Sequence, residues 1–129
     1  MKKRILWIDD DLDILESVDF ILQAEGYDTQ TLDSPSNIFD QILLYKPDLI
    51  LMDINMGDYD GLEVCRNIKA NLSTEEYPII LVSADIRVKS AAQYGAIGYM
   101  LKPFNIDLLL GIIEQSLSAK FNTSEEPSF

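Results

Sequence analysis

The chain has 129 residues, of which 47% are hydrophobic, and this is enough for the core of one domain. It contains no histidine, which excludes Ser-His-Asp catalysis, His-ligated metals and a phosphohistidine of its own. The net charge of −12 argues against direct nucleic-acid binding, which depends largely on Lys and Arg, and the single cysteine excludes an internal disulfide and agrees with a reducing compartment.

The first predicted strand, Lys3–Ile8, is rich in β-branched and aromatic residues. Its apolar part is too short for a signal peptide, so we expect a cytoplasmic protein without membrane insertion. Asp9, Asp10 and Asp11 follow at the carboxyl end of this strand, and apolar residues then recur at helical spacing until Gly26. Asp11 can cap that helix, but a helix needs only one such cap, so Asp9 and Asp10 are available for another role.

The next segment, Tyr27–Leu32, alternates as a half-exposed edge strand does. Ser34 and Pro35 form a cap and first-position pair that predicts the start of a second helix. A short apolar run that begins at Asp48 then indicates a buried strand, which ends at Asp53. The residues after it are polar turn formers, so we expect Asp53 at the mouth of a site, where the strand gives way to a loop, and not in a core.

The second half of the chain continues to alternate between helices and strands. Its predicted elements are a helix after Gly61 with Leu62, Cys65 and Ile68 on one side, a strand Ile79–Val82 ending at Ser83, a short helix from about Asp85 to Tyr94 closed by Gly95, a strand Gly98–Leu101 ending at Lys102, and a last helix capped by Asn105. The buried stripe of that helix is predicted to be Ile106, Leu109, Leu110, Ile113 and Leu117. We expect one domain over residues 1–118 and a disordered tail over 119–129.

Five strands that alternate with five helices predict an α/β fold with a doubly wound parallel sheet covered on both faces, in three layers. Right-handed crossovers restrict the possible windings, and five strands favour the order 2-1-3-4-5 of the flavodoxin type. The switch point of this order lies between strands one and three. It brings Asp9 and Asp10 beside Asp53.

Polar residues of complementary chemistry therefore lie at the carboxyl ends of four strands. They are Asp9, Asp10, Asp53, Ser83 and Lys102. Three neighbouring carboxylates repel by roughly 4 kcal/mol per pair at about 4 Å and an effective dielectric near 20, so their pKa values must rise or a cation must bind. Oxygen ligands without His or Cys favour Mg²⁺, with Asp10 and Asp53 as direct ligands, Asp9 through a water, and the backbone carbonyl of Asn55.

An aspartate beside Mg²⁺ and a lysine can act as a nucleophile towards phosphorus, because phosphoryl transfer mainly needs positioning and charge compensation. Asp53 is the candidate nucleophile, Lys102 the compensating cation, and Ser83 the hydroxyl for a phosphoryl oxygen. Pro103 restricts the backbone directly after Lys102 and so makes the direction of that lysine less arbitrary.

These motifs resemble the receiver domain of two-component response regulators over about Lys3 to Leu117. The matching segments are Asp9-Asp10, Asp53 within Leu-Met-Asp-Ile-Asn-Met, Ser83-Ala84, and Gly98 to Phe104. The resemblance implies a stand-alone, CheY-like phosphoacceptor, and not an enzyme that turns over a separate substrate. Asp53 would then take a phosphoryl group from a phosphohistidine on a partner kinase or phosphotransfer protein, with Mg²⁺ required.

The resemblance also implies a switch. Ser83 would move towards the aspartyl phosphate while Tyr99 turns inward, which changes the face of the fourth helix, fifth strand and fifth helix where a downstream target protein binds. Three features depart from the family pattern. Gly57 stands where proline is usual, which predicts a more mobile loop, and Ser83 replaces the commoner threonine. The segment from Ser83 to Gly95 is about one helical turn short, which predicts a truncated fourth helix and an altered partner surface.

Several alternatives remain open from the sequence. A haloacid-dehalogenase-like phosphatase needs a second acid two residues after its nucleophile, where this chain has Asn55. A dinucleotide-binding module needs glycines where this chain has aspartates after the first strand, and a purely structural interaction module would not bind Mg²⁺. Within the receiver family, the chain can be an intermediate of a phosphorelay or a diffusible adaptor, and Asn55 and Asp85 flank the site where a phosphoryl lifetime would be set.

Overall fold

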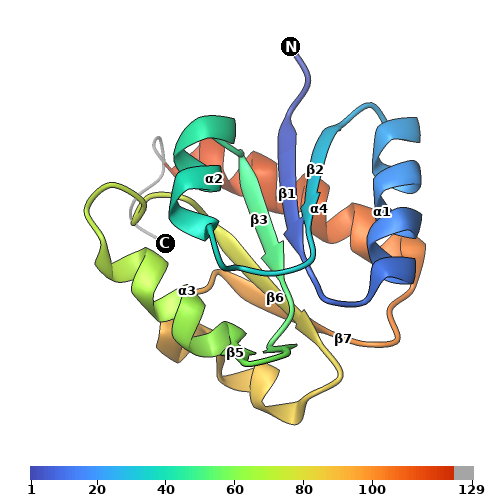
Figure 1. Cartoon of the computed structure of the whole chain (residues 1–129). Coiled ribbons are helices and arrows are strands. Elements are labelled where there is room, and N and C mark those ends of the chain that lie inside the picture. Colours follow the sequence, from blue (N-terminus) through green and yellow to red (C-terminus); the bar gives the residue numbers. More distant parts are fainter. Residues whose placement is uncertain (124–129) are drawn as a thin grey trace.

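The computed structural model describes residues 1–123 and contains a five-stranded parallel sheet (Figure 1). Its strands are β1 (Arg4–Ile8), β2 (Asp28–Leu32), β3 (Leu49–Met52), β6 (Ile79–Ser83) and β7 (Gly98–Leu101). They lie in the order β2-β1-β3-β6-β7, and every neighbouring pair is parallel. This is the predicted order 2-1-3-4-5, because β6 and β7 are the fourth and fifth strands of the sheet.

Helices cover both faces of the sheet and form the outer layers. They are α1 (Leu12–Ala24), α2 (Ile38–Tyr45), α3 (Gly61–Ala70), the 3₁₀ helix η1 (Ile86–Tyr94) and α4 (Ile106–Thr123). Successive strand residues point to opposite faces, so each strand contributes to two cores. Trp7 and Leu51 pack in the core beneath α1 and α4, whereas Ile8 and Met52 pack in the core beneath α2, α3 and η1. The predicted three-layer arrangement is confirmed.

The helix caps agree with the sequence in two places. Asp11 accepts hydrogen bonds from the backbone N–H groups of Asp13 and Ile14 at the start of α1, and Asn105 accepts one from Leu108 at the start of α4. Leu109 and Ile113 form the buried side of α4, but Ile106 is 39% exposed and the prediction of its burial is wrong. Ile106 is the first residue of α4, where the chain has only just left the loop after β7.

The last helix is longer than expected. Our domain boundary at residue 118 lies inside α4, which extends to Thr123. Residues 124–129 of the predicted tail lie outside the described residues. No helix in the described part of the chain is long and apolar enough to cross a membrane.

The second helix begins later than the Ser34-Pro35 pair predicts. α2 starts at Ile38, and its cap residue Asn37 makes no side-chain capping bond. The Ser34 hydroxyl instead accepts a hydrogen bond from the N–H of Ser36, and the N–H of Ile38 donates to the carbonyl of Pro35. The serine therefore stabilises a separate turn before the helix, which is a competing use of the same residue type.

Two local elements differ from the expected loop and helix. Asn55–Met56 (β4) and Tyr59–Asp60 (β5) pair as a short antiparallel hairpin, in which Gly57 has a φ of +66°. Proline cannot adopt that angle, so the glycine permits a turn that the usual family residue would forbid. The short helix predicted for Asp85–Tyr94 is confirmed in extent, with Gly95 closing it at a φ of +92°, but it is a 3₁₀ helix.

Candidate functional site

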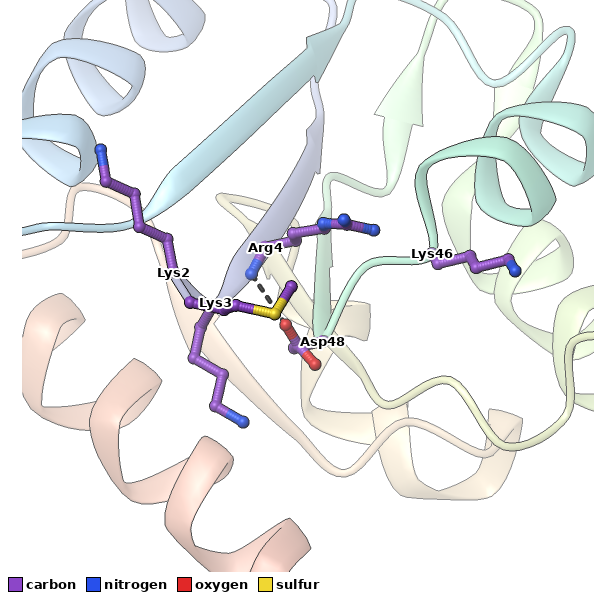
Figure 2. Close-up of a pocket in the computed structure, with 6 residues that line it drawn as sticks. Lys2, Lys3, Arg4, Lys46 and Asp48 are labelled. Carbon is purple, nitrogen blue, oxygen red and sulfur yellow. Dashed lines mark hydrogen bonds between the residues drawn. The ribbon is translucent and has the colours of Figure 1, made fainter.

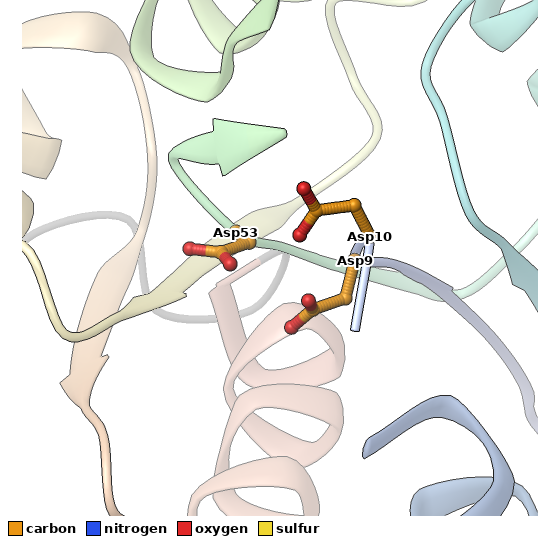
Figure 3. A group of neighbouring side chains, drawn as sticks. All are labelled: Asp9, Asp10 and Asp53. Carbon is orange, nitrogen blue, oxygen red and sulfur yellow. The ribbon is translucent and has the colours of Figure 1, made fainter. Parts of the chain in front are cut away.

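The three aspartates that follow β1 and β3 meet at one edge of the sheet, as predicted. The strands pair in parallel with Ile8 beside Met52, and the N–H of Asp53 donates to the carbonyl of Ile8 at 3.0 Å. One carboxylate oxygen from each of Asp9, Asp10 and Asp53 lies within 4.8 Å of the other two. Figure 3 shows the carboxylates of Asp9 and Asp10 on the side that faces Asp53. Asp9 and Asp53 are buried, and Asp10 is exposed.

Lys102 reaches this acidic cluster from the end of β7. Its Nζ donates to Asp9 Oδ2 at 2.7 Å and to Asp53 Oδ2 at 3.0 Å, and its side chain is only 15% exposed. The backbone N–H of Lys102 donates to the carbonyl of Ser83, which fixes the start of the loop, and the Lys102–Pro103 peptide bond is cis. The predicted lysine therefore contacts two of the three carboxylates directly.

Burial and charge affect the ionisation of this cluster in opposite directions. Burial raises the pKa of Asp9 above its usual value, and the hydrogen bond from Lys102 offsets part of this rise. Burial acts to lower the pKa of Lys102, but its hydrogen bonds to Asp9 and Asp53 outweigh burial, so its pKa lies above the usual value. The ammonium is thus held in its charged form between two carboxylates.

The cluster has the chemistry of a site for a hard divalent cation. Three carboxylates and one ammonium leave two negative charges uncompensated when all are ionised, and every ligand atom is oxygen. These features fit Mg²⁺, which prefers oxygen ligands and keeps several waters. The exposed position of Asp10 leaves room for those waters. Asn55 lies in β4, two residues after Asp53, and its backbone carbonyl remains a predicted ligand.

The two predicted switch residues differ in exposure. Ser83 ends β6, is 1% exposed, and its Oγ accepts a hydrogen bond from the N–H of Asp85 at 3.2 Å. Tyr99 lies in the edge strand β7 and is 43% exposed, so the ring faces outward in this structure. The structure therefore brings Ser83, but not the Tyr99 ring, into the interior near the ends of β3 and β7.

Gly61 supports the site in a way that the sequence reading did not identify. A Cβ added to this residue would lie 2.0 Å from the backbone oxygen of Asp53 and 2.8 Å from Cα of Ile54. The N–H of Gly61 also donates to the carbonyl of Ile54 at 2.6 Å. The start of α3 therefore packs against the backbone of Asp53 at a distance that only glycine permits. The sequence signal was the glycine itself, at the start of a helix where it has no cap role.

A polar network around Arg87 was also missed. The guanidinium of Arg87, in η1, donates to Asp60 Oδ2 at 3.1 Å through Nη1 and to Asn55 Oδ1 at 3.3 Å through Nη2. It also pairs with Asp85 Oδ2 at 2.9 Å, and Asn55 Nδ2 donates to the same oxygen at 3.2 Å. We name this set of Asn55, Asp60, Asp85 and Arg87 the Arg87 brace. These contacts lower the pKa of Asp85 to about 2, chiefly through the side-chain hydrogen bond from Arg87.

A basic hollow lies at the opposite edge of the sheet, where β1 and β3 begin. It is lined by Met1, Lys2, Lys3, Arg4, Lys46 and Asp48. Figure 2 shows the lysine side chains pointing away from one another, and the backbone N–H of Arg4 donates to Asp48 at 2.8 Å. The charges do not converge on one point, so this hollow has a weaker case as a site than the acidic cluster.

Comparison with known proteins gives the same family as the site. The family model described as response regulator receiver domain matches residues 5–114. The chain belongs to this family. A solved CheY-like receiver domain from Methanospirillum hungatei JF-1 covers 95% of the chain, with a TM-score of 0.86 and 28% identity, and is itself covered over 98% of its length. The flavodoxin-like or CheY-like fold and the resemblance stated from the motifs are therefore confirmed.

Two longer regulators are also similar to this receiver domain. The DNA-binding response regulator MtrA of Mycolicibacterium smegmatis is 32% identical over 107 residues, which are 81% of this chain and 46% of MtrA. The cell cycle response regulator CtrA of Brucella ovis is 34% identical over 113 residues, which are 85% of this chain and 48% of CtrA. The chain thus spans less than half the length of these relatives.

Proposed function

We propose that this receiver domain accepts a phosphoryl group on Asp53 from a phosphohistidine of a partner kinase or phosphotransfer protein. The observation that carries the proposal is the Lys102 ammonium, which lies 3.0 Å from Asp53 Oδ2 within the cluster of three carboxylates. A buried carboxylate beside a fixed cation is suited to a reaction in which negative charge must be compensated at a transferring phosphoryl group.

In the transfer, a carboxylate oxygen of Asp53 attacks phosphorus while the bond from phosphorus to the imidazole nitrogen breaks. The electron pair of that bond stays on the nitrogen, which takes a proton from solvent, and the product is an acyl phosphate. Lys102 compensates charge on the phosphoryl oxygens. Asp53 Oδ1 accepts from the N–H of Ile54 at 2.6 Å, and this bond orients the carboxylate.

Mg²⁺, held by Asp10, Asp53, a water on Asp9 and the backbone carbonyl of Asn55, would supply additional charge compensation and bind phosphoryl oxygens. The fit rests on the oxygen-only ligands and on the two uncompensated negative charges of the cluster. Asp9 also accepts from the N–H of Asp11 at 2.9 Å, which fixes the turn that carries Asp10.

The phosphodonor partner has a suitable surface beside the cluster. An apolar hollow next to Lys102 is lined by Ile14, Ala84, Pro103 and Phe104, so it joins α1 to the loop after β7. A second hollow continues along α1 and shares Ile14 and Phe104. An apolar surface that ends at Lys102, which contacts the acceptor carboxylate, favours docking of a partner helix that carries the phosphohistidine.

We infer that phosphorylation is reported through η1, β7 and α4. Ser83 would turn its hydroxyl towards a phosphoryl oxygen, and Tyr99, now exposed, would turn inward. Apolar side chains already exposed on this side include Ile86 and Ile97. Their exposure and the 3₁₀ form of η1 support our prediction of an altered surface for a downstream target, as an adaptor or as a relay intermediate.

Binding of nucleic acid by this chain is not part of the proposal. MtrA is named as a DNA-binding regulator, but the chain matches only 46% of its length. The net charge of −12 supports binding to proteins over binding to phosphate backbones. A cytoplasmic location, which the single cysteine supports, stays a prediction.

The test is phosphoryl incorporation from acetyl phosphate, a small acyl phosphate, with and without Mg²⁺. Wild type should incorporate one phosphoryl group only with Mg²⁺, and Asp53→Asn should incorporate none because the amide is not a nucleophile for phosphorus. Asp58→Asn is the matched control, because it makes the same change at an exposed position in the turn between β4 and β5. Incorporation retained in Asp53→Asn would overturn the proposal, and multiple turnovers of a phosphoester would favour the phosphatase alternative.

A further inference from the structure

The Arg87 brace connects the two loops that begin beside Asp53 and Ser83. Asn55 lies two residues after Asp53, and Asp85 lies two residues after Ser83. Arg87 contacts both, and it also contacts Asp60, which caps α3 by accepting from the N–H of Leu62. One guanidinium thus ties the hairpin after β3 and the start of α3 to the start of η1.

Ser83 is connected to this brace through Asp85. In the structure, Ser83 Oγ accepts from the N–H of Asp85 at 3.2 Å. Asp85 in turn caps η1 by accepting from the N–H of Arg87 at 2.9 Å and pairs with the guanidinium of the same residue. One continuous set of hydrogen bonds therefore connects the Ser83 hydroxyl, the start of η1 and the Arg87 side chain.

The first turn of η1 contains one buried and one exposed apolar side chain. Val88 and Ala91 are the buried residues of η1, whereas Ile86 is 63% exposed. Its far end is fixed by Arg66, which lies over the ring of Tyr94 at 4.3 Å, and by the thiol of Cys65, which contacts the Tyr94 carbonyl. A 3₁₀ helix of nine residues has poorer hydrogen-bond geometry than an α-helix, so the hydrogen bonds of the brace add to the stability of its first turn.

We propose that Arg87 is a positioning residue that stabilises the unphosphorylated arrangement of the site by tying the loop after Ser83 to the hairpin after Asp53. The inference rests on the proposed function, in which Ser83 turns towards the phosphoryl group. That turn removes the hydrogen bond between Ser83 and Asp85 and displaces the start of η1. Contacts made in one arrangement and lost in the other shift the equilibrium towards the first, so the brace weakens the response to phosphorylation.

The experiment measures the affinity of beryllofluoride with Mg²⁺, a mimic of the phosphoryl group, by calorimetry on the full chain. Arg87→Gln should bind it roughly three- to tenfold more tightly than wild type, since the brace consists of partly exposed pairs that each contribute modestly. Arg87→Lys should bind beryllofluoride nearly as tightly as Arg87→Gln does, because an ammonium keeps the charge but cannot reproduce the planar fork of donors.

Lys89→Gln is the matched control. Lys89 is exposed on the same helix, makes no hydrogen bond or ion pair with the described residues, and loses the same single charge. If net charge alone mattered, Lys89→Gln would bind as tightly as Arg87→Gln, and Arg87→Lys would equal wild type. That pattern would overturn the inference. So would an unchanged affinity in both Arg87 variants, or weaker binding by Arg87→Gln than by wild type.

Hydrogen exchange of the ligand-free proteins gives a second readout. The amides of Asp85 and Arg87 should exchange faster in Arg87→Gln than in Lys89→Gln, because their acceptors are Ser83 Oγ and Asp85 Oδ1. Faster exchange with unchanged affinity would mean that Arg87 has only a structural role, and the inference would fail. If wild type binds no beryllofluoride, the proposed function fails and the inference falls with it. If wild type binds and the Arg87 variants match Lys89→Gln, only the inference fails.

Discussion

Gly61→Ala is expected to disturb the acceptor site although the substitution adds a single methyl group. The new Cβ would lie 2.0 Å from the backbone oxygen of Asp53, whereas ordinary contact begins near 3.4 Å. Both atoms belong to short, fixed segments, since Gly61 is the first residue of α3 and Asp53 directly follows β3. A side chain cannot rotate away, so the backbone must shift by about 1.4 Å.

The expected magnitude follows from this shift. Adding atoms to a packed region typically costs about 1–3 kcal/mol of unfolding free energy, and here the obstacle is backbone. A displacement of about 1 Å at a reacting group can reduce a rate by about a hundredfold. We therefore expect Gly61→Ala to lose about 1–3 kcal/mol of stability and to accept phosphoryl from acetyl phosphate at least about tenfold more slowly than wild type.

Gly111→Ala is the matched control for this prediction. Gly111 lies in α4, is exposed, and has no atom within 4 Å of an added Cβ, so alanine should stabilise the protein by about 0.4–1 kcal/mol. Urea unfolding followed by Trp7 fluorescence measures both variants. Equal stability and equal phosphorylation rates for the two alanine variants would refute the close approach of Gly61 to Asp53.

Two further predictions concern Asp9 and Gly57. Burial raises the pKa of Asp9, so the folded protein binds the proton of this carboxyl more tightly than the unfolded chain does. Without metal, the free energy of unfolding should therefore fall as pH rises from the usual aspartate pKa of 3.8 through the raised pKa of the folded protein. Asp9→Asn should remove this part of the slope in urea unfolding measured in EDTA, and identical slopes would contradict it. Gly57→Pro should lower the unfolding free energy by more than about 1 kcal/mol, because proline cannot adopt the φ of +66°, and an unchanged thermal midpoint would exclude the observed turn.

The strand order could be predicted because it depends on few, strong signals. Runs such as Leu49–Met52 are apolar throughout and are buried on both faces, which is typical of the centre of a parallel sheet. The alternating segment Asp28–Leu32 is only partly buried and lies at an edge. Given short connections and right-handed crossovers, these patterns leave few windings, and the carboxylates after β1 and β3 become neighbours.

The ends of helices and turns depend on weaker signals that compete with one another, and they were predicted less well. A serine followed by proline can cap a helix or a turn, and Ser34 stabilises a turn because its hydroxyl accepts from the N–H of Ser36. Gly57 signals only that an unusual φ is allowed, and the pairing of β4 with β5 depends on contacts that a single strand does not encode.

The residues of the site differ in the same way, because the sequence specifies the positions of some and only the folded structure specifies those of others. Strand ends fix the backbone positions of Asp9, Asp53 and Lys102. The two aspartates have short side chains with few possible positions, and Lys102 ends the strand beside Ser83, so their meeting follows from topology. Arg87 has a long side chain on an exposed helix, and its partners lie 27 and 32 residues away in the chain. Which carboxylate it reaches depends on the position of η1 to within a few ångströms, because hydrogen bonds weaken steeply with distance and angle. The residues that carry out the proposed chemistry are therefore readable from the sequence, whereas those that bias its equilibrium become visible only once the loops are placed.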